Sequence, residues 1–328
     1  MMRPAFPTIE AYGRTFTNAA FWRPYVEYVW SFIRIGTVHD CKAGLPGTHP
    51  VFVVNDTYII KFFTNLFGVA SNQVELAFYQ QVAPHLPVSI PSLVTHGALF
   101  PAEPDGPWHW PYIITTRLQG VSIGEAHLQT PEFPAEAARY AAGVLQAFHN
   151  APLHSDSSIL DASWQGFAAL LSERRQAIRP AIEQLAIAPT LRSELLARLD
   201  TMPTPYDTSK TPRLLHGDLN RDHILGVVRE GESFAFTGVI DFGDVKVGDP
   251  LYDLVPLHFG LFATDKTLLR VFLDTYGGVA ELGSDFAQRA MDYTLLYESD
   301  VLTDWLDNNP EGRAIANLAA LQDRLWRI

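Results

Sequence analysis

Two polar segments, each beginning where a short apolar run ends, contain the groups in this chain that are best suited to proton transfer and metal binding. The first is LLHGDLNRDHIL at residues 214–225, and the second is GVIDFGD at residues 238–244. Each contains a carboxylate close behind its apolar run, Asp218 three residues after Leu215 and Asp241 directly after Ile240. A carboxylate held at a strand end can accept a proton from an alcohol, and a second carboxylate nearby can bind a divalent cation. The sequence therefore predicts one cleft that contains both Asp218 and Asp241.

Three short apolar runs are expected to position these two carboxylates. Residues 213–215 and 234–241 have the composition of strands, and the run 223–228 lies between them. The sequence Glu-Gly-Glu at 230–232 is expected to turn the run 223–228 back as a hairpin. This arrangement predicts that Asp218 and Asp241 lie at the ends of neighbouring strands.

The two segments together resemble the aminoglycoside phosphotransferase family, which has a protein-kinase-like fold. The matching features are His-Gly-Asp-Leu at 216–219, a ligand position five residues after Asp218, Ile-Asp-Phe-Gly-Asp at 240–244 and Gly-Asp-Pro at 248–250. The resemblance continues upstream through 59–63, 75–79 and 110–114, and it covers roughly residues 20–260. The Phe-Trp-x-Pro start and the Trp-Pro-Tyr segment are most similar to the hygromycin-B phosphotransferases.

This resemblance implies an α+β fold with two lobes. Residues 1–119 would form a nucleotide-binding lobe, with an antiparallel sheet and a helix. Residues 120–328 would form a mainly helical lobe for catalysis and substrate binding. The implied activity is ATP-dependent transfer of a phosphate to a hydroxyl of a small molecule, an aminoglycoside such as hygromycin B, with ATP and Mg²⁺ or Mn²⁺ as cofactors.

The resemblance also assigns roles to individual residues. Lys61 would bind the nucleotide phosphates and pair with Glu75, Asp218 would be the base, and Asp241 would bind the metal. His216 would orient the loop that holds Asp218. The adenine would hydrogen-bond to the backbone of residues 119–122, the connection between the lobes, and Thr115 and Leu118 just before it are further cofactor-binding candidates.

One position departs from the pattern of most relatives, which have Asn as the second metal ligand where this chain has His223. Mg²⁺ prefers oxygen ligands, whereas imidazole suits softer ions such as Mn²⁺ or Zn²⁺. We expect His223 to contact one metal ion. Asn220 lies three residues too early to take the same place.

The formal net charge of −12 argues against nucleic-acid partners and favours a polycationic substrate. Acidic residues accumulate between residues 285 and 311, where Arg289 is the only basic residue. Such a run is either a solvated face or a subsite for substrate ammonium groups. Asp300 and Asp304, one helical turn apart, are the individual substrate-binding candidates.

Other features bear on the compartment in which the protein works. A single cysteine, Cys41, excludes an internal disulfide framework and suits a reducing compartment. Residues 1–10 lack an apolar signal core, and no apolar run approaches the length of a membrane span. A cytoplasmic protein with no membrane partner is therefore expected.

Local patterns predict the remaining elements. A helix over 18–35 would have Asn18 as its cap, and a helix over 70–82 would have Ser71 as its cap. Strands are expected at 51–54, 58–63, 93–99 and 112–118, the last two separated by a turn at 101–107, and a loop at 40–48. Further helices are expected at 135–149, 164–178, 191–199 and within 251–276, with a loop approaching the catalytic strand between 189 and 212. His127, His149 and His154 have no metal-ligand spacing and are expected to be structural or exposed.

Three alternatives remain open from the sequence. His216 and Asp218 with the later His258 mimic the two-histidine, one-carboxylate site of iron oxygenases. The second alternative is a catalytically weak or inactive member of the family that only binds nucleotide or a partner. The last alternative is a kinase of another small alcohol, such as choline, a sugar or a macrolide.

Overall fold

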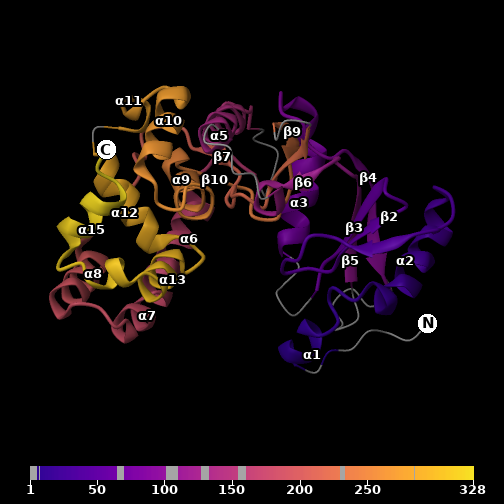
Figure 1. The fold of residues 1–328 in the computed structure, drawn as a ribbon, viewed down its shortest axis with the longest axis horizontal. Helices are drawn as coiled ribbons and strands as arrows, with labels where there is room; N and C mark the ends of the chain where they lie inside the picture. The colour runs from indigo at the N-terminus through magenta and orange to yellow at the C-terminus, as the bar shows by residue number, and fades with distance from the viewer. Residues whose placement is uncertain are drawn as a thin grey trace.

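The N-terminal part of the chain forms a five-stranded antiparallel sheet, which lies on the right in Figure 1. This computed structural model describes residues 6, 8–64, 70–100, 110–126, 133–153, 160–229, 233–283 and 285–328. The expected turns at 101–107 and 230–232, and the residues His127 and His154, lie outside the described residues. The strand order is β1-β2-β3-β5-β4, with bounds β1 (Cys41–Ala43), β2 (Val51–Val54), β3 (Tyr58–Phe62), β4 (Leu93–Leu99) and β5 (Trp110–Thr116).

Strand β1 corrects the expectation of a continuous loop over residues 40–48. It has three residues, pairs with β2 and lies at the edge of the sheet. A short edge strand needs no buried alternation, and these residues are half-buried or exposed. The apolar pattern from which strands are predicted is therefore missing here.

Helix α2 (Ala19–Ile33) covers this sheet, and it begins at the predicted cap, since the side chain of Asn18 accepts from Phe21 N at 3.1 Å. Its aromatic stripe is core packing, as predicted. The ring of Trp22 is fully buried and lies 5.1 Å from that of Phe62 and from that of Trp110. These rings form a core with the inner face of the sheet.

Helix α3 (Ala70–Gln81) belongs to a second and larger core. Phe78 stacks on Phe242 at 4.2 Å and on Phe148 at 5.7 Å, so α3 packs on residues from the C-terminal part. The lobe boundary near residue 120 stays a prediction, but this packing ties α3 to both parts. Ser71 is not a cap, because it lies inside α3 and its hydroxyl hydrogen-bonds His49 Nε2 at 3.1 Å.

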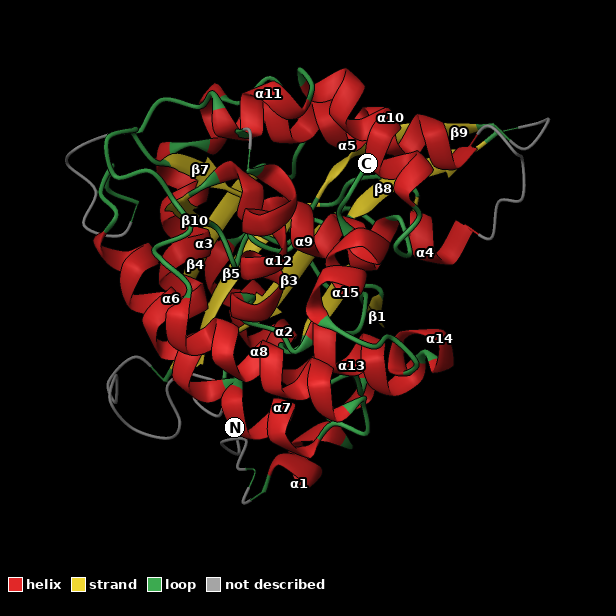
Figure 2. Cartoon of the chain, turned by 90° about the vertical axis from the view of Figure 1, so that its left-hand side faces the viewer, coloured by secondary structure: helices red, strands yellow, loops and turns green. Residues whose placement is uncertain are grey.

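The C-terminal part is mainly helical, and Figure 2 shows its helices gathered in front of the strands. Its longer helices are α5 (Phe133–His149), α6 (Gln165–Ala177), α7 (Arg179–Gln184), α8 (Pro189–Thr201), α10 (Lys266–Tyr276), α12 (Phe286–Leu296), α13 (Val301–Asn308) and α15 (Leu318–Leu325). The shorter helical segments of the chain are α1 (Ile9–Gly13), η1 (Ala83–His85), α4 (Ile123–Ala126), η2 (Pro250–Asp253), α9 (Leu254–Pro256), η3 (Leu257–Leu261), α11 (Val279–Leu282) and α14 (Pro310–Arg313). Helix α8 starts with Pro189 in its first turn, a position that suits proline, so the loop expected from residue 189 begins only after α8. Every helix among the described residues is too short or too polar to cross a bilayer.

Two small sheets connect the helices to the cleft. Strands β6 (Val121–Ser122), β8 (Ile224–Val228) and β9 (Phe234–Val239) form one, and β7 (Arg213–Leu215) pairs with β10 (Lys246–Gly248) in the other. The hairpin of β8 and β9 confirms the prediction. The prediction that Asp218 and Asp241 follow neighbouring strands is wrong, because β7 and β9 belong to different sheets. Sequence alternation identifies strands but not their partners.

Buried neutral histidines should make the fold sensitive to acid. His258, in the π-helical turn η3, is fully buried with its ring 4.5 Å from that of Trp326, and burial lowers its pKa to about 3. Below its ordinary pKa of about 6.5, the unfolded chain gains a proton that the folded chain refuses until about pH 3. The free energy of unfolding should therefore fall by up to about 1.4 kcal/mol per pH unit in this window through His258 alone.

In the variant His258→Leu this contribution is absent, so its thermal midpoint should fall less than that of wild type between pH 7 and pH 5. Replacing the exposed His96 by Gln is the matched control and should leave the slope unchanged. Equal slopes in His258→Leu and wild type would contradict the expectation.

Candidate active site

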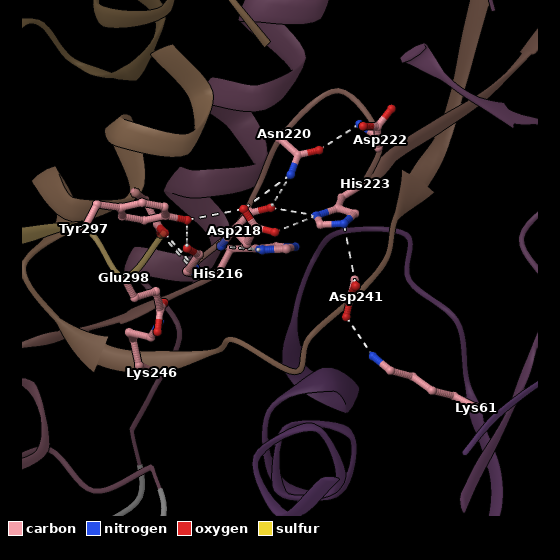
Figure 3. A network of polar contacts seen from close by, with 12 residues as sticks. Lys61, His216, Asp218, Asn220, Asp222, His223, Asp241, Lys246, Tyr297 and Glu298 are labelled. Carbon is pink, nitrogen blue, oxygen red and sulfur yellow. Dashed lines mark hydrogen bonds and ion pairs between the residues drawn. The ribbon is translucent and has the colours of Figure 1, made fainter. Parts of the chain in front are cut away.

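Lys61 lies on β3 and projects into the cleft, because its neighbours Ile60 and Phe62 are fully buried on the opposite face. Its Nζ atom donates to Glu75 Oε2 on α3 and to Asp241 Oδ1 after β9, both at 2.8 Å. The Lys61–Glu75 pair predicted from the sequence is therefore present. Figure 3 shows the ammonium directed at Asp241.

The buried charges of this cluster shift one another's protonation. Burial lowers the pKa of Lys61, but the carboxylates of Asp241 and Glu75 outweigh burial and raise it above its ordinary value. Burial also raises the pKa of Asp241, and here the charge of Lys61 prevails, so the net shift is downward. Burial raises the pKa of Glu75 more than Lys61 lowers it. The cluster therefore keeps an ammonium and the Asp241 carboxylate ionised inside the protein.

The backbone of Asp241 has a φ of 66°, which is uncommon for a residue other than glycine. The next residue, Phe242, is fully buried against Phe78 and fixes the chain in this conformation. The two oxygens of Asp241 consequently face different partners, Oδ1 toward Lys61 and Oδ2 toward His223 Nε2 at 3.6 Å.

The loop after β7 is held by a residue that the sequence analysis missed. Asp253, at the end of η2, is fully buried, and its carboxylate accepts from His216 N at 3.0 Å and from Gly217 N at 2.7 Å. His149 Nε2 donates to the same carboxylate at 3.0 Å, so this histidine is structural, as predicted. An acid inside the apolar run Leu-Tyr-Asp-Leu-Val was the available signal, since a buried carboxylate requires several donors.

Asp218 follows this fixed turn. Its Oδ1 atom lies 3.2 Å from Tyr297 Oη and 3.3 Å from Asn220 Nδ2. Burial raises the pKa of Asp218 to about 6, helped by the negative charges of Asp244 and Asp241. His216 Nδ1 accepts from Asp218 N at 3.4 Å, which is the orienting contact expected of that histidine.

His223 lies between the two aspartates (Figure 3). Its Nδ1 donates to the carbonyl oxygen of Asp218 at 2.6 Å, because a carbonyl only accepts. The neutral ring then has its lone pair on Nε2, which faces Asp241 Oδ2. This is the tautomer that a metal ion needs, and the contact of Nδ1 with a carbonyl is a common support for a metal-binding histidine.

The side chains of Asp241 and His223 fit a divalent ion, whose other ligands would have to come from phosphates and water. No group of three His, Cys, Asp or Glu side chains that would hold a metal alone is found within the described part of the chain. Mg²⁺ in phosphoryl-transfer sites is usually bound by one or two protein groups and the substrate. His258, which would be a ligand in the iron-oxygenase alternative, is fully buried, with its ring 4.5 Å from that of Trp326.

A cavity of about 550 Å³ contains the predicted nucleotide-binding residues, a size typical of a ligand site. The predicted residues that line it are Lys61, Glu75, Thr115, Leu118, His223 and Asp241. The loop with Gly44 and Gly47 borders the same space.

Asp300 and Asp304 do not line this cavity, and both are exposed. Asp300 pairs with Arg174 of α6 at 2.7 Å, and other acids of the run 285–311 also have cations from outside it. Arg198 binds the buried Asp292 through two hydrogen bonds, and Lys246 pairs with Glu298. The run is thus neither wholly solvated nor wholly available to a ligand. The sequence analysis counted only the basic residues within the run and so missed these partners from other elements.

Comparison with known proteins finds a phosphotransferase family whose matched region contains the cleft residues described above. Residues 46–291 match the phosphotransferase enzyme family. Viomycin phosphotransferase from Streptomyces vinaceus is 28% identical over 182 residues, which cover 53% of this chain and 57% of that protein. Lysine-specific demethylase JMJ21 from Arabidopsis thaliana is 22% identical over 274 residues, which cover 67% of this chain and 29% of that protein. The chain therefore spans only part of the length of each of these relatives.

Solved structures share the fold at low identity. The GDP complex of wild-type aminoglycoside 2'-phosphotransferase-IIIa has a TM-score of 0.64 at 21% identity, covering 94% of this chain and 98% of that one. The streptomycin–ATP ternary complex of APH(2")-IIa has a TM-score of 0.55 at 18% identity, covering 89% and 98%. The predicted two-lobed, kinase-like α+β fold is confirmed, and the chain belongs to the phosphotransferase enzyme family.

Proposed function

We propose that this protein transfers the γ-phosphate of ATP to a hydroxyl of a small polycationic molecule, an aminoglycoside or related antibiotic such as hygromycin B. The observation that carries the proposal is the chain of contacts that runs from Lys61 through Asp241 and His223, which line the cavity, to Asp218, which lies behind His223. Along this chain of contacts lie, in order, a cation for phosphates (Lys61), two ligands for a metal ion (Asp241 and His223) and a base (Asp218).

Each group has a role that follows from its charge and position. Lys61, held by Glu75, binds phosphate oxygens, and the glycine-containing loop and the Thr115–Leu118 strand end enclose the nucleotide. Asp241 and His223 would hold a Mg²⁺ or Mn²⁺ ion, which would supply positive charge beside the phosphates. Asp218 accepts the proton of the acceptor hydroxyl, and the oxygen of that hydroxyl forms a bond to the γ-phosphorus. The bond from phosphorus to the nucleoside diphosphate breaks, and the diphosphate leaves with that electron pair.

The nature of the acceptor is argued from charge and from relatives. The net charge of −12 attracts a polycation over long range. Solved structures with this fold include complexes with kanamycin, streptomycin and gentamicin. Asp300 and Asp304 remain candidates for binding ammonium groups because both are exposed. They rank second because neither lines the cavity and Asp300 already pairs with Arg174.

A screen for nucleotide diphosphate release tests the proposal. It pairs ATP or GTP with kanamycin, streptomycin, hygromycin B, viomycin or choline, and mass spectrometry detects the phosphate added to the acceptor. Both nucleotides are included because the related structures hold GDP, ADP or ATP. Phosphorylated choline alone would favour the small-alcohol alternative, and absence of transfer to every acceptor would contradict the proposal.

Replacing the base should remove turnover but not nucleotide binding. In Asp218→Asn the amide cannot take a proton, so kcat should fall by about 10²–10⁴-fold. Nucleotide affinity should stay close to wild type, because Asp218 does not line the cavity. Steady-state kinetics with a fluorescent nucleotide titration measure both quantities, and Asp274→Asn, on the exposed face of α10, is the matched control.

The pH profile should report the same carboxyl. The base works as a carboxylate, and burial raises the pKa of Asp218 to about 6 from an ordinary value near 4. The value of kcat/KM should therefore decline as pH falls through about 6, rather than near pH 4. A profile that stays flat down to pH 5 would exclude Asp218 as the titrating base.

His223 should set the metal preference. In His223→Asn an oxygen ligand replaces the imidazole, so activity with Mg²⁺ relative to Mn²⁺ should rise. Titrations of both ions into wild type and variant provide the measurement, with direct Mn²⁺ binding as a second readout. Identical profiles for the two proteins would show that His223 does not contact the metal.

A further inference from the structure

Tyr297 contacts the catalytic loop from the side opposite the nucleotide residues (Figure 3). It follows the end of α12, is 2% exposed, and its hydroxyl donates to the carbonyl of Gly217 at 2.6 Å. The same oxygen lies 3.2 Å from Asp218 Oδ1. The chemistry proposed above makes no use of this residue.

The turn before Asp218 is held at Gly217, where both the N–H and the carbonyl group form hydrogen bonds. Gly217 has a φ of 85°, and a Cβ atom there would lie 2.0 Å from the carbonyl oxygen of Asp244, so only glycine fits. Its N–H donates to Asp253 at 2.7 Å, and its carbonyl accepts from Tyr297. The direction in which Asp218 leaves the turn therefore depends on Tyr297 as well as on Asp253.

The two oxygens of Asp218 are consequently unequal. Oδ1 accepts from Asn220 Nδ2 at 3.3 Å and lies 3.2 Å from Tyr297 Oη, whose single proton it shares with the closer carbonyl oxygen of Gly217 in a three-centre hydrogen bond. Oδ2 lies 3.7 Å from His223 Nδ1, beyond hydrogen-bond distance, and that nitrogen already donates to the backbone. Oδ2 is thus the oxygen with a lone pair left for an incoming hydroxyl.

Tyr297 is itself held in place by the residue that follows it. Glu298 N donates to Tyr252 Oη at 3.1 Å, and the Glu298 carboxylate pairs with Lys246 on β10. Tyr252 also packs on Tyr297, with ring centroids 5.0 Å apart. The corner after α12 is therefore anchored to the strand that pairs with β7.

We propose that Tyr297 is a positioning residue that, together with Asn220, holds Oδ1 of Asp218 and leaves Oδ2 to take the proton of the acceptor. This inference rests on the proposed function. In the transfer step the acceptor O–H bond breaks, its proton goes to Oδ2, and the acceptor oxygen forms the bond to phosphorus as the nucleoside diphosphate leaves. Tyr297 exchanges no proton in this step.

The decisive comparison is between two buried tyrosines of the same region. Tyr297→Phe removes the hydroxyl beside Asp218, whereas Tyr293→Phe removes one that donates to Pro205 O at 3.3 Å, away from the catalytic loop. Tyr297→Phe should lower kcat by about tenfold or more, with the nucleotide KM changed by less than about twofold. Tyr293→Phe should retain wild-type kcat, and the thermal midpoints should show that both variants are folded.

Asn220→Ala provides an independent test should Tyr297→Phe not fold. It should also lower kcat at constant nucleotide KM, because Oδ1 loses its other donor. Equal kcat in Tyr297→Phe, Asn220→Ala and wild type would overturn the inference and leave the proposed function intact. Wild-type protein that transfers phosphate to none of kanamycin, streptomycin, hygromycin B, viomycin or choline would overturn both.

Discussion

The arrangement of the site depends on one interaction, the pairing of the buried Lys61 ammonium with the carboxylates of Glu75 and Asp241. It joins a strand of the N-terminal sheet, helix α3 and the loop after β9. A buried cation is costly unless it is paired, and removing one partner leaves an uncompensated charge. The cleft therefore cannot relax apart without exposing these groups to water. In the proposed function, phosphate oxygens would take the place of Asp241 beside the ammonium, which would leave Asp241 to a metal ion.

A second constraint acts on the catalytic loop through uncharged backbone groups. Asp253 accepts two successive N–H groups at the turn, and the turn has room for nothing larger than glycine at residue 217. Asp218, the base in the proposed function, is thus positioned first by the backbone of the turn that precedes it. Burial of the same region raises the pKa of Asp218, so one packing arrangement provides both the geometry and the basicity.

Sequence reasoning found what depends on local pattern. It identified the helix capped by Asn18, the strand with Lys61 and the loops with Asp218 and Asp241, because alternation, capping and motif spacing are short-range properties. It missed Asp253 and Tyr297, which act over 36 and 80 residues of separation. It also paired the wrong strands, since β7 pairs with β10 and not with the hairpin. Partner choice at long range depends on tertiary packing, which a single sequence does not display.

The same limit applies to charge. A net charge of −12 describes the field at a distance, where a polycation is attracted, but local pairing decides which acids can bind it. Asp292 is buried under Arg198 and Glu298 is matched by Lys246, so neither offers a free carboxylate to a ligand. The pair of Glu298 and Lys246 instead stabilises the corner that bears Tyr297. Acidic residues of this run therefore act locally by pairing with cations and fixing the residues beside Asp218, while the long-range field arises from the whole surface.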